Sequence, residues 1–263
     1  MEITFVKMHG NGNDFILIDE YEKTVIPDEM KPQFAQLYCD RRFGIGADGV
    51  LYLSRSGSAD LKMRLFQPDE SEAPMCGNGI RCFAKYAFDT GYVEKSCTVE
   101  TMAGIISVVM DYTDDTFLAT IQMPEPRFDR ADIPATGEGE YTETIEGYMV
   151  YAVNTGVPHA VIFVEDPASF PLIEIGPAIR HHASFSEGAN VNIVKREGED
   201  HISIRTYERG VEDETFSCGT GATAAAAIAR HLGYTGTKVK VDTRGGPLVI
   251  TLGEKTLMEG PAE

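Results

Sequence analysis

The chain has few basic residues for its size. Its 263 residues include 23 lysines and arginines against 41 aspartates and glutamates, which gives a formal net charge of −18 at pH 7. Such a charge repels both a phosphate backbone and an anionic membrane surface, so it disfavours nucleic acid and membranes as partners. An acidic excess of this kind is more typical of a surface that serves solubility or salt tolerance.

Long apolar runs and targeting signals are also lacking. The longest uncharged apolar run, residues 219–229, is much shorter than a membrane span and is rich in alanine. The initial methionine leads directly into an alternating, strand-like pattern at residues 3–6, with no basic leader before it. We therefore expect a soluble protein of the cytoplasm.

The cysteines are few and are not arranged as a framework. There are five, an odd number, at positions 39, 76, 82, 97 and 218, and no Cys-x-x-Cys pair occurs. This pattern indicates neither a disulfide scaffold nor a zinc ribbon, so we expect reduced thiols and no metal site.

Two short segments do carry a signal, because they nearly repeat one another. Residues 75–79 read MCGNG and residues 217–221 read SCGTG, and more than half of the chain separates them. The near-repeat suggests a duplicated unit with one thiol in each half. Such an arrangement suits a reaction that needs two opposed bases.

Secondary-structure patterns agree with a duplication. The Asn-Gly step in residues 9–14 predicts an opening hairpin, and residues 124–126 (PEP) break both periodicities and suggest a boundary. We therefore predict an α/β (α+β) fold with domains at residues 1–123 and 124–263, each with strands around one central helix. Helices are predicted at residues 32–39, 79–90 and 221–232. Further strands are predicted at residues 3–6, 15–18, 62–66, 105–110, 119–123, 149–153, 160–164, 190–194, 202–207, 238–241 and 248–252.

The repeated Cys-Gly-x-Gly has a chemical reading at a strand-to-helix junction. Its glycines allow a tight turn, and the helix start offers unpaired N–H groups that favour a bound carboxylate. The positive end of the helix dipole lies at the same place. It lowers a thiol pKa from about 8.5 to between roughly 3.5 and 7.5 in documented cases, which makes the thiol a usable base. Buried cysteines are more often core residues, and we keep that interpretation for Cys39, Cys82 and Cys97. For Cys76 and Cys218 the repeat favours function, with a redox dithiol as the rival.

Five segments, in order along nearly the whole chain, resemble the diaminopimelate epimerases. They are residues 7–15 (KMHGNGNDF), 44–49 (GIGADG), 75–82 (MCGNGIRC), 207–210 (YERG) and 218–221 (CGTG). Proline racemases share the two-thiol logic but carry different residues around the first cysteine. The resemblance implies two similar domains, each a β-barrel-like sheet wrapped around a central helix, with the active site in the cleft between them.

The resemblance also implies an activity that needs no cofactor. These isomerases interconvert LL-2,6-diaminopimelate and meso-diaminopimelate on the route to lysine, without pyridoxal phosphate. By the match, Cys76 and Cys218 are the catalytic pair: one thiolate removes the α-proton while the other thiol delivers a proton to the opposite face. The helix starts at Gly77-Asn78 and Gly219-Thr220 would hold the reacting carboxylate. The partner expected is a small amino-acid substrate, and by analogy a second copy in a homodimer.

Other roles follow only from the resemblance, and each has a structural alternative. Asn13 is implied to bind substrate, although it could merely cap the hairpin turn. Asn190, Glu208 and Arg209 are implied to hold the distal amino-acid group, although the last two could form a solvated ion pair. His159, with Glu208, is implied to adjust the thiol pKa values, although a lone histidine is usually a satisfied, partly buried side chain.

The chain departs from the family pattern at several positions. Gln67 and Val157 replace asparagines of the pocket for the distal carboxylate, and Gly49 replaces a glutamine found in some members. Gln67 keeps an amide and remains a candidate substrate ligand. Val157 cannot donate a hydrogen bond, and a lost charge-assisted bond is worth roughly 1.5–3 kcal/mol. The chain also ends at residues 260–263, where members often continue into a strand that returns to the first domain, so we expect that strand to be missing.

Two alternatives therefore remain beside the epimerase. One is a related cofactor-independent racemase of another amino acid, such as histidine. The other belongs to a different class, a thiol redox or carboxylate-binding protein that uses the same helix ends.

Overall fold

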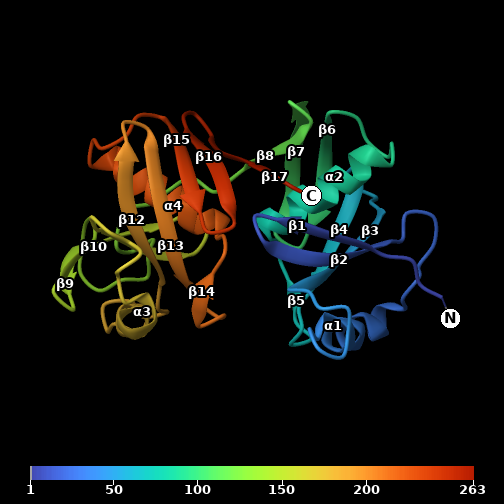
Figure 1. The fold of residues 1–263 in the computed structure, drawn as a ribbon, viewed down its shortest axis with the longest axis horizontal. Coiled ribbons are helices and arrows are strands. Elements are labelled where there is room, and N and C mark those ends of the chain that lie inside the picture. The colour runs from blue at the N-terminus through green and yellow to red at the C-terminus, as the bar shows by residue number, and fades with distance from the viewer. Residues whose placement is uncertain (1) are drawn as a thin grey trace. The chain divides into compact units, whose positions relative to one another are not determined.

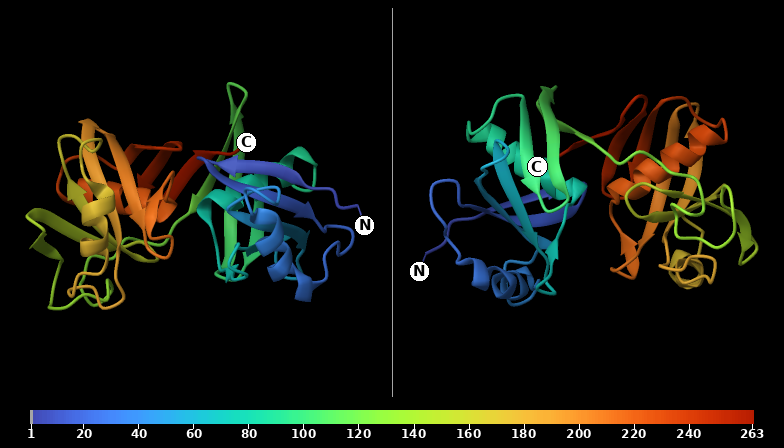
Figure 2. Two further views of the ribbon diagram at one scale, coloured as in Figure 1. Left: turned by 60° about the horizontal axis from the view of Figure 1, so that its bottom comes forward. Right: turned by 180° about the vertical axis from the view of Figure 1, so that it is seen from behind.

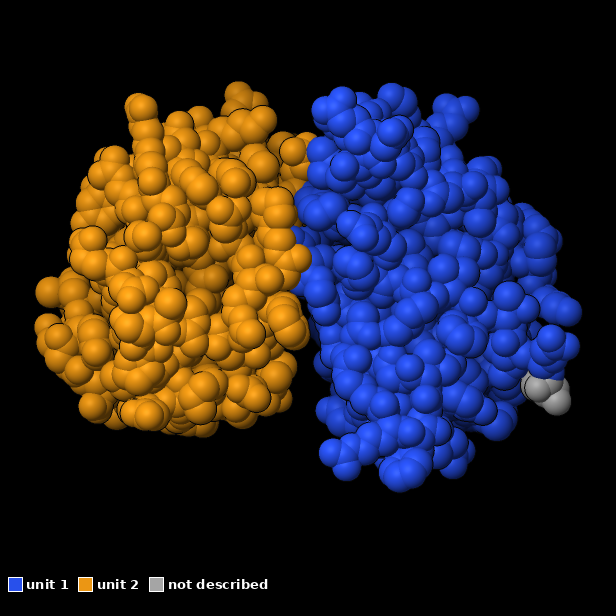
Figure 3. Space-filling model, viewed as in Figure 1, with its two compact units in different colours: residues 1–121, 260–263 blue, residues 122–259 orange. Residues whose placement is uncertain are grey.

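The computed structural model describes residues 2–263 and divides into two compact units. Unit 1 consists of Met1–Ile121 together with Gly260–Glu263, and unit 2 of Gln122–Glu259 (Figure 3). The division after Ile121 lies close to the boundary at residues 124–126 that the proline pattern suggests. The C-terminal residues 260–263 belong to unit 1, whereas the sequence pattern assigns them to the second domain.

Unit 1 opens with the predicted hairpin. Strand β1 (Val6–Gly10) pairs antiparallel with β2 (Asn13–Asp19). Asn11 and Gly12 form the turn with positive φ values of 52° and 81°, the conformation that an Asn-Gly step favours in a two-residue hairpin. The other elements of unit 1 are η1 (Asp28–Met30), α1 (Lys31–Cys39), β3 (Gly49–Arg55), β4 (Leu61–Phe66), β5 (Glu72–Ala73), α2 (Gly77–Asp89), β6 (Ser96–Thr101), β7 (Gly104–Thr113) and β8 (Thr116–Gln122), which ends at the start of unit 2.

Unit 2 repeats this plan, which the reader can follow by the labels in Figure 1 and by the same colours in Figure 2. Its elements are β9 (Thr142–Ile145), β10 (Tyr148–Asn154), β11 (Pro158–Phe163), α3 (Leu172–Arg180), β12 (Asn190–Gly198), β13 (His201–Glu208), β14 (Asp213–Thr215), α4 (Gly219–His231), β15 (Lys238–Thr243), β16 (Gly246–Leu252) and β17 (Thr256–Pro261), which ends in unit 1.

A series of five strands pairs in the same way in both units. In unit 1, β2 pairs parallel with β3, β3 antiparallel with β4, β4 parallel with β6, and β6 antiparallel with β7. In unit 2, β11, β12, β13, β15 and β16 repeat the same series of parallel and antiparallel pairings. The short strands β5 and β14 pair at the equivalent places on β4 and β13. The prediction of two similar α/β domains is confirmed.

Each unit is built around one helix. Helix α2 contacts β1, β2, β3, β4 and β7, and α4 contacts β10, β11, β12, β13, β15 and β16. In α4, every residue from 221 to 229 is buried, and most of them are alanine. Small side chains let strands approach a helix from several sides, which accounts for the alanine run. Both helices begin at the residue directly after a cysteine, two residues earlier than the sequence pattern predicts.

The sequence pattern missed helix α3, the short helical segment η1 and strands β3, β5, β9, β14 and β17. Strand β3 reads as a continuous apolar run because it is buried along most of its length, and continuous runs lack the alternation of half-exposed strands. Helix α3 contains Pro177 next to Gly176, two residues that normally argue against a helix interior. Strand β6 was also missed. Among residues 2–263, no helix is long and apolar enough to cross a membrane.

The chain does return to unit 1, so the expectation of a missing C-terminal strand is wrong. Strand β17 ends at Pro261, and the backbones of His9 and Glu263 exchange two hydrogen bonds of 2.7 and 2.9 Å. Arg81 of α2 donates to the carbonyl of Pro261 at 3.1 Å, and also to the Gly77 carbonyl and to the side chains of Asn11 and Asn78. Arg81 is fully buried, and this burial lowers its pKa to about 10.

Arg81→Met should therefore destabilise the protein strongly. It removes the donor from four acceptors, two of them on the buried side chains of Asn11 and Asn78. We expect the free energy of unfolding to fall by roughly 3 kcal/mol, measured by urea denaturation. Arg55→Met is the matched control, because the Arg55 side chain is 61% exposed, and its loss should stay below about 1 kcal/mol. Equal losses in the two variants would contradict this account of the C-terminal attachment.

Candidate active site

Cys76 caps the central helix of unit 1. Its backbone is extended, with φ −140° and ψ 121°, and its carbonyl accepts the first helical hydrogen bond, from Ile80. Its Sγ accepts from the backbone N–H of Gly79 at 3.4 Å and donates to Asn13 Oδ1 at 3.5 Å. The thiol therefore lies at the positive end of the α2 dipole, with a side-chain amide against it.

The amide of Asn13 is oriented by a carboxylate. Asn13 Nδ2 donates to Asp48 at 2.6 Å, and Arg41 holds the other oxygen of Asp48 at 2.7 Å. A carboxylate accepts only, so Asn13 must turn its Oδ1 towards Cys76 and Asn78, whose Nδ2 lies 3.3 Å away. The side chain of Asn13 thus does more than cap the hairpin. Sequence reasoning missed Arg41 and Asp48, although Asp48 lies in the GIGADG segment that carries the family resemblance.

A second carboxylate braces this network. Asp14 accepts hydrogen bonds from Arg41 and from Lys7, and its backbone N–H donates to Asp48. Partial burial alone would raise the pKa of Asp14, but the hydrogen bonds from Arg41 and Lys7 outweigh it and hold the pKa at about 2. Asp14 is therefore ionised at neutral pH and keeps Arg41 beside Asp48.

Cys218 caps the central helix of unit 2 in the same way. Its backbone is extended, with φ −124° and ψ 110°, and its carbonyl accepts from the N–H of Ala222. The Cys218 Sγ lies 3.3 Å from the hydroxyl of Thr220, and the carbonyl of Thr220 accepts from the Thr155 hydroxyl at 2.9 Å. The cysteine is 7% exposed. The two halves thus place their thiols at equivalent helix starts but surround them with different polar groups.

The remaining cysteines lie in the core, as predicted. Cys39, Cys82 and Cys97 are buried, and burial raises the pKa of the Cys39 thiol to about 11 and those of Cys82 and Cys97 to about 12. Such thiols stay protonated at neutral pH and are poor bases.

His159 lies in the interior of unit 2, on β11. It is fully buried, and its Nδ1 lies 3.0 Å from Nδ2 of Asn192 on the neighbouring strand β12. Burial, together with the positive charge of Arg209, lowers the pKa of His159 to about 3, so the ring is neutral at physiological pH. The influence of His159 on a thiol stays a prediction. Asn192 lies in none of the five segments that carry the family resemblance, and sequence reasoning missed it.

Asn190 and Arg209 are joined through the backbone. Asn190 is buried, accepts from the Arg209 N–H at 2.8 Å and donates to the Pro158 carbonyl at 3.0 Å. The guanidinium of Arg209 donates to the carbonyl of Glu187 at 3.2 Å. Asn190 therefore ties the end of β13 to the start of β11, which positions residues 208 and 209. Contact of Asn190, Glu208 or Arg209 with substrate stays a prediction.

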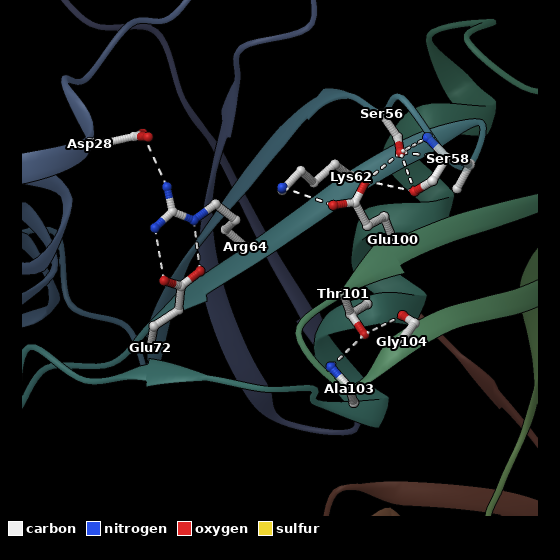
Figure 4. A network of polar contacts seen from close by, with 11 residues as sticks. Asp28, Ser56, Ser58, Lys62, Arg64, Glu72, Glu100, Thr101, Ala103 and Gly104 are labelled. Atoms are coloured by element: carbon white, nitrogen blue, oxygen red, sulfur yellow. Dashed lines mark hydrogen bonds and ion pairs between the residues drawn. The ribbon is translucent and has the colours of Figure 1, made fainter.

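Gln67 is exposed in the turn that links β4 to β5. Its amide oxygen accepts from the Ser71 hydroxyl at 3.1 Å. Arg64 on β4 and Glu72 on β5 join the two ends of this turn through two hydrogen bonds of 2.7 and 2.8 Å. Asp28 also pairs with Arg64 (Figure 4). The ion pair thus stabilises the turn that carries Gln67, nine residues before Cys76.

Close packing explains why residue 49 is a glycine. A Cβ there would stand 2.7 Å from a methyl carbon of Leu65 and 3.0 Å from the carbonyl oxygen of Phe66. A longer side chain, such as the glutamine of some family members, would need β3 and β4 to shift. Within the described residues, no group of three or more His, Cys, Asp or Glu side chains is placed to hold a metal ion.

The fold has counterparts among solved structures. A PhzF-family protein of Bacillus anthracis matches all of this chain and 97% of its own length, with a TM-score of 0.67 and 16% identity. A probable proline racemase of Agrobacterium radiobacter matches all of this chain and 91% of its own, with a TM-score of 0.66 and 16% identity. These likenesses define the fold class.

Sequence relatives define the family. The model of the diaminopimelate epimerase family matches residues 5–128 and 151–263. The diaminopimelate epimerase of Methanothrix thermoacetophila is 55% identical over 99% of this chain and 93% of its own, and that of Archaeoglobus fulgidus is 49% identical over 97% and 91%. The chain belongs to the diaminopimelate epimerase family, a family of isomerases.

The second glycine of each Cys-Gly-x-Gly should respond differently to alanine. A Cβ on Gly221 would stand 2.5 Å from Asn192 Oδ1, whereas a Cβ on Gly79 meets nothing closer than 3.4 Å. Gly221→Ala should therefore lower the free energy of unfolding by about 1–3 kcal/mol. Gly79→Ala should be neutral or stabilising by up to about 1 kcal/mol, since alanine favours a helix. Urea denaturation of the pair checks this, and a greater loss in Gly79→Ala would contradict it.

The buried His159 should make stability depend on pH. Its pKa is lower in the folded than in the unfolded protein, where it is about 6.5. The unfolded state therefore binds more protons below that value, and the stabilisation present above pH 6.5 is lost as the pH falls. Between pH 6.5 and 5, wild type should lose about 1.5 kcal/mol more than His159→Gln. Parallel urea-denaturation curves against pH for the two proteins would refute a buried neutral His159.

Proposed function

We propose that this protein interconverts LL-2,6-diaminopimelate and meso-diaminopimelate on the route to lysine. This is the isomerisation after which its family is named. The observation that carries the proposal is the pair of equivalent helix starts. Cys76 and Cys218 cap the central helices of two units that share a series of five equivalently paired strands. A duplicated fold that keeps a thiol at the same place in each half fits inversion at carbon, which needs a base and an acid on opposite faces.

In the proposed reaction, one thiolate takes the α-proton and the other thiol returns a proton to the opposite face. Cys76 and Cys218 exchange these roles with the direction of the reaction. The α-hydrogen of an amino acid is very weakly acidic, so charge that develops on the carboxylate must be stabilised. The backbone N–H groups of Gly77-Asn78 and Gly219-Thr220 lie at the helix starts and are proposed to supply that stabilisation.

The remaining groups are proposed to bind the substrate and to adjust the pKa values of the two thiols. Asn13 is proposed to contact substrate, which its position against the Cys76 thiol supports. Gln67 is proposed to contribute an amide to the distal end of the substrate, where Asn190, Glu208 and Arg209 are also assigned. His159 and Glu208 are proposed to adjust the thiols.

We also propose a cytoplasmic location and a homodimer, without a nucleic-acid or membrane partner and without a cofactor. The acidic composition supports the lack of polyanionic partners. Two catalytic thiols need a reducing compartment, which supports the cytoplasm. The homodimer rests on analogy with related enzymes alone.

The test is incorporation of solvent deuterium at the α-carbon of diaminopimelate. Wild type should exchange and epimerise, and Cys76→Ser and Cys218→Ser should each lose about 10²- to 10⁴-fold in rate because a hydroxyl is a poor base. Cys39→Ala is the matched control, since Cys39 is a buried core thiol, and it should keep the exchange. Absence of exchange in wild type would reject the proposal.

A comparison of inversion rates for several amino acids would show whether the substrate is a different one. Val157 lacks the hydrogen-bonding group of the family pattern, which is the observation that favours another amino acid. Faster inversion of histidine or another monocarboxylic amino acid than of diaminopimelate would assign the alternative racemase. A Cys76–Cys218 disulfide under physiological reductant, without any exchange, would assign the redox alternative.

A further inference from the structure

Asn192 has a complete set of hydrogen bonds in the interior of unit 2. Its amide nitrogen lies 3.0 Å from the carbonyl oxygen of Ala160 and 3.0 Å from Nδ1 of His159. Its Oδ1 accepts from the hydroxyl of Thr206 at 3.0 Å. Asn192 is fully buried, as is His159, and Thr206 is 3% exposed. No solvent competes for these bonds, so their donors and acceptors can be assigned one by one.

The backbone decides which way the amide of Asn192 points. The carbonyl of Ala160 can only accept, so the atom beside it must be the NH₂ group of Asn192. That group has two protons, and the second is directed to His159 Nδ1. A nitrogen that accepts a hydrogen bond carries no proton, and a neutral imidazole must then carry its proton on the other nitrogen, Nε2.

The ring is also held neutral. Its burial and the nearby charge of Arg209 both lower the pKa of His159. The Nε2 atom is itself buried and has no hydrogen-bond partner among residues 2–263. An unpaired donor in a protein interior is rare in a native structure, and such groups often have a role in binding or catalysis.

Asn192 also adjoins the catalytic helix start. A Cβ on Gly221 would stand 2.5 Å from Asn192 Oδ1 and 3.4 Å from Cys218 Sγ. The amide and the thiol therefore flank the same glycine, the last residue of the second Cys-Gly-x-Gly. Gly221 leaves the space that Asn192 fills, so the motif glycine and the buried amide form one packing unit.

We propose that Asn192 is a positioning residue that fixes His159 as the neutral tautomer with its proton on Nε2, so that His159 can serve the reaction as a hydrogen-bond donor and not as a base. The catalytic part of this proposal rests on the proposed function, whereas the tautomer does not. A donor stabilises a thiolate or a substrate carboxylate without taking a proton. The proton that moves in the reaction then stays with the two thiols.

The experiment is ¹⁵N nuclear magnetic resonance of the imidazole rings at pH 7.5, with steady-state kinetics on the same samples. The protein has six histidines, so His159→Gln identifies the His159 signals by their loss. Wild type is expected to show a neutral His159 ring with protonated Nε2. In Asn192→Asp, a carboxylate faces Nδ1 and can only accept, so the proton should move to Nδ1 or the ring should become charged. The kcat should fall by about 10²-fold with little change in KM.

Thr206→Val is the matched control. It removes the hydroxyl that donates to Asn192 Oδ1 but leaves the NH₂ group bound to the Ala160 carbonyl. The tautomer should therefore stay as in wild type even if the protein is less stable. If Asn192→Asp does not fold, the wild-type spectrum still decides the tautomer, and Asn192→Ala, which removes the donor, should release the ring to a mixture of tautomers.

The outcomes separate the two proposals. A wild-type His159 that is charged, or protonated on Nδ1, would overturn the assignment, and so would an Asn192→Asp variant with the wild-type tautomer and full kcat. The expected tautomer in a protein that exchanges no deuterium into diaminopimelate would uphold the role of Asn192 and reject the proposed function.

Discussion

The structure depends on helices that begin inside a sheet. The first turn of any helix leaves N–H groups without partners, and burying them is costly unless another group accepts their hydrogen bonds. Here α2 and α4 each begin among the strands of their own unit, directly after a cysteine in extended conformation. A bound carboxylate would satisfy those donors. The same constraint that makes the helix start demanding to fold therefore makes it suited to bind an anion, and a cysteine lies directly before each of the two helix starts.

The two halves share this plan but have diverged around it. Cys76 has a partly exposed side chain with the oriented amide of Asn13 against it, whereas Cys218 is nearly buried next to the Thr220 hydroxyl. In unit 1, Asp48 and Arg41 orient Asn13 beside the Cys76 thiol, whereas in unit 2 the buried amide of Asn192 lies beside Gly221 and bonds to His159. The proposed reaction does not require identical surroundings, because the two thiols would face opposite sides of one α-carbon.

Local sequence signals predicted most of the fold and the two cysteines. The Asn-Gly turn, the glycines after the cysteines and the alanine run each act within a few residues, so they can be read from one segment. Asp48, Arg41 and Asn192 could not be assigned in that way, since the residues that they contact lie on segments that meet only in the folded chain. The return of the C-terminus was predicted wrongly for a related reason. Arg81 reaches the Pro261 carbonyl across 180 positions of sequence, and nothing near either residue indicates the pairing.

The alanine run of α4 bears on the order in which unit 2 folds. Alanine has the highest intrinsic helix propensity, so this segment can populate helical turns before any strand is in place. Those turns have little apolar surface of their own, and they become stable only when strands from β10 to β16 enclose them. Because the enclosure is complete from residue 221 to 229, the amides there can exchange with solvent only when the surrounding sheet opens. The slowest-exchanging protons of unit 2 should thus lie on α4, in the stretch that begins three residues after Cys218.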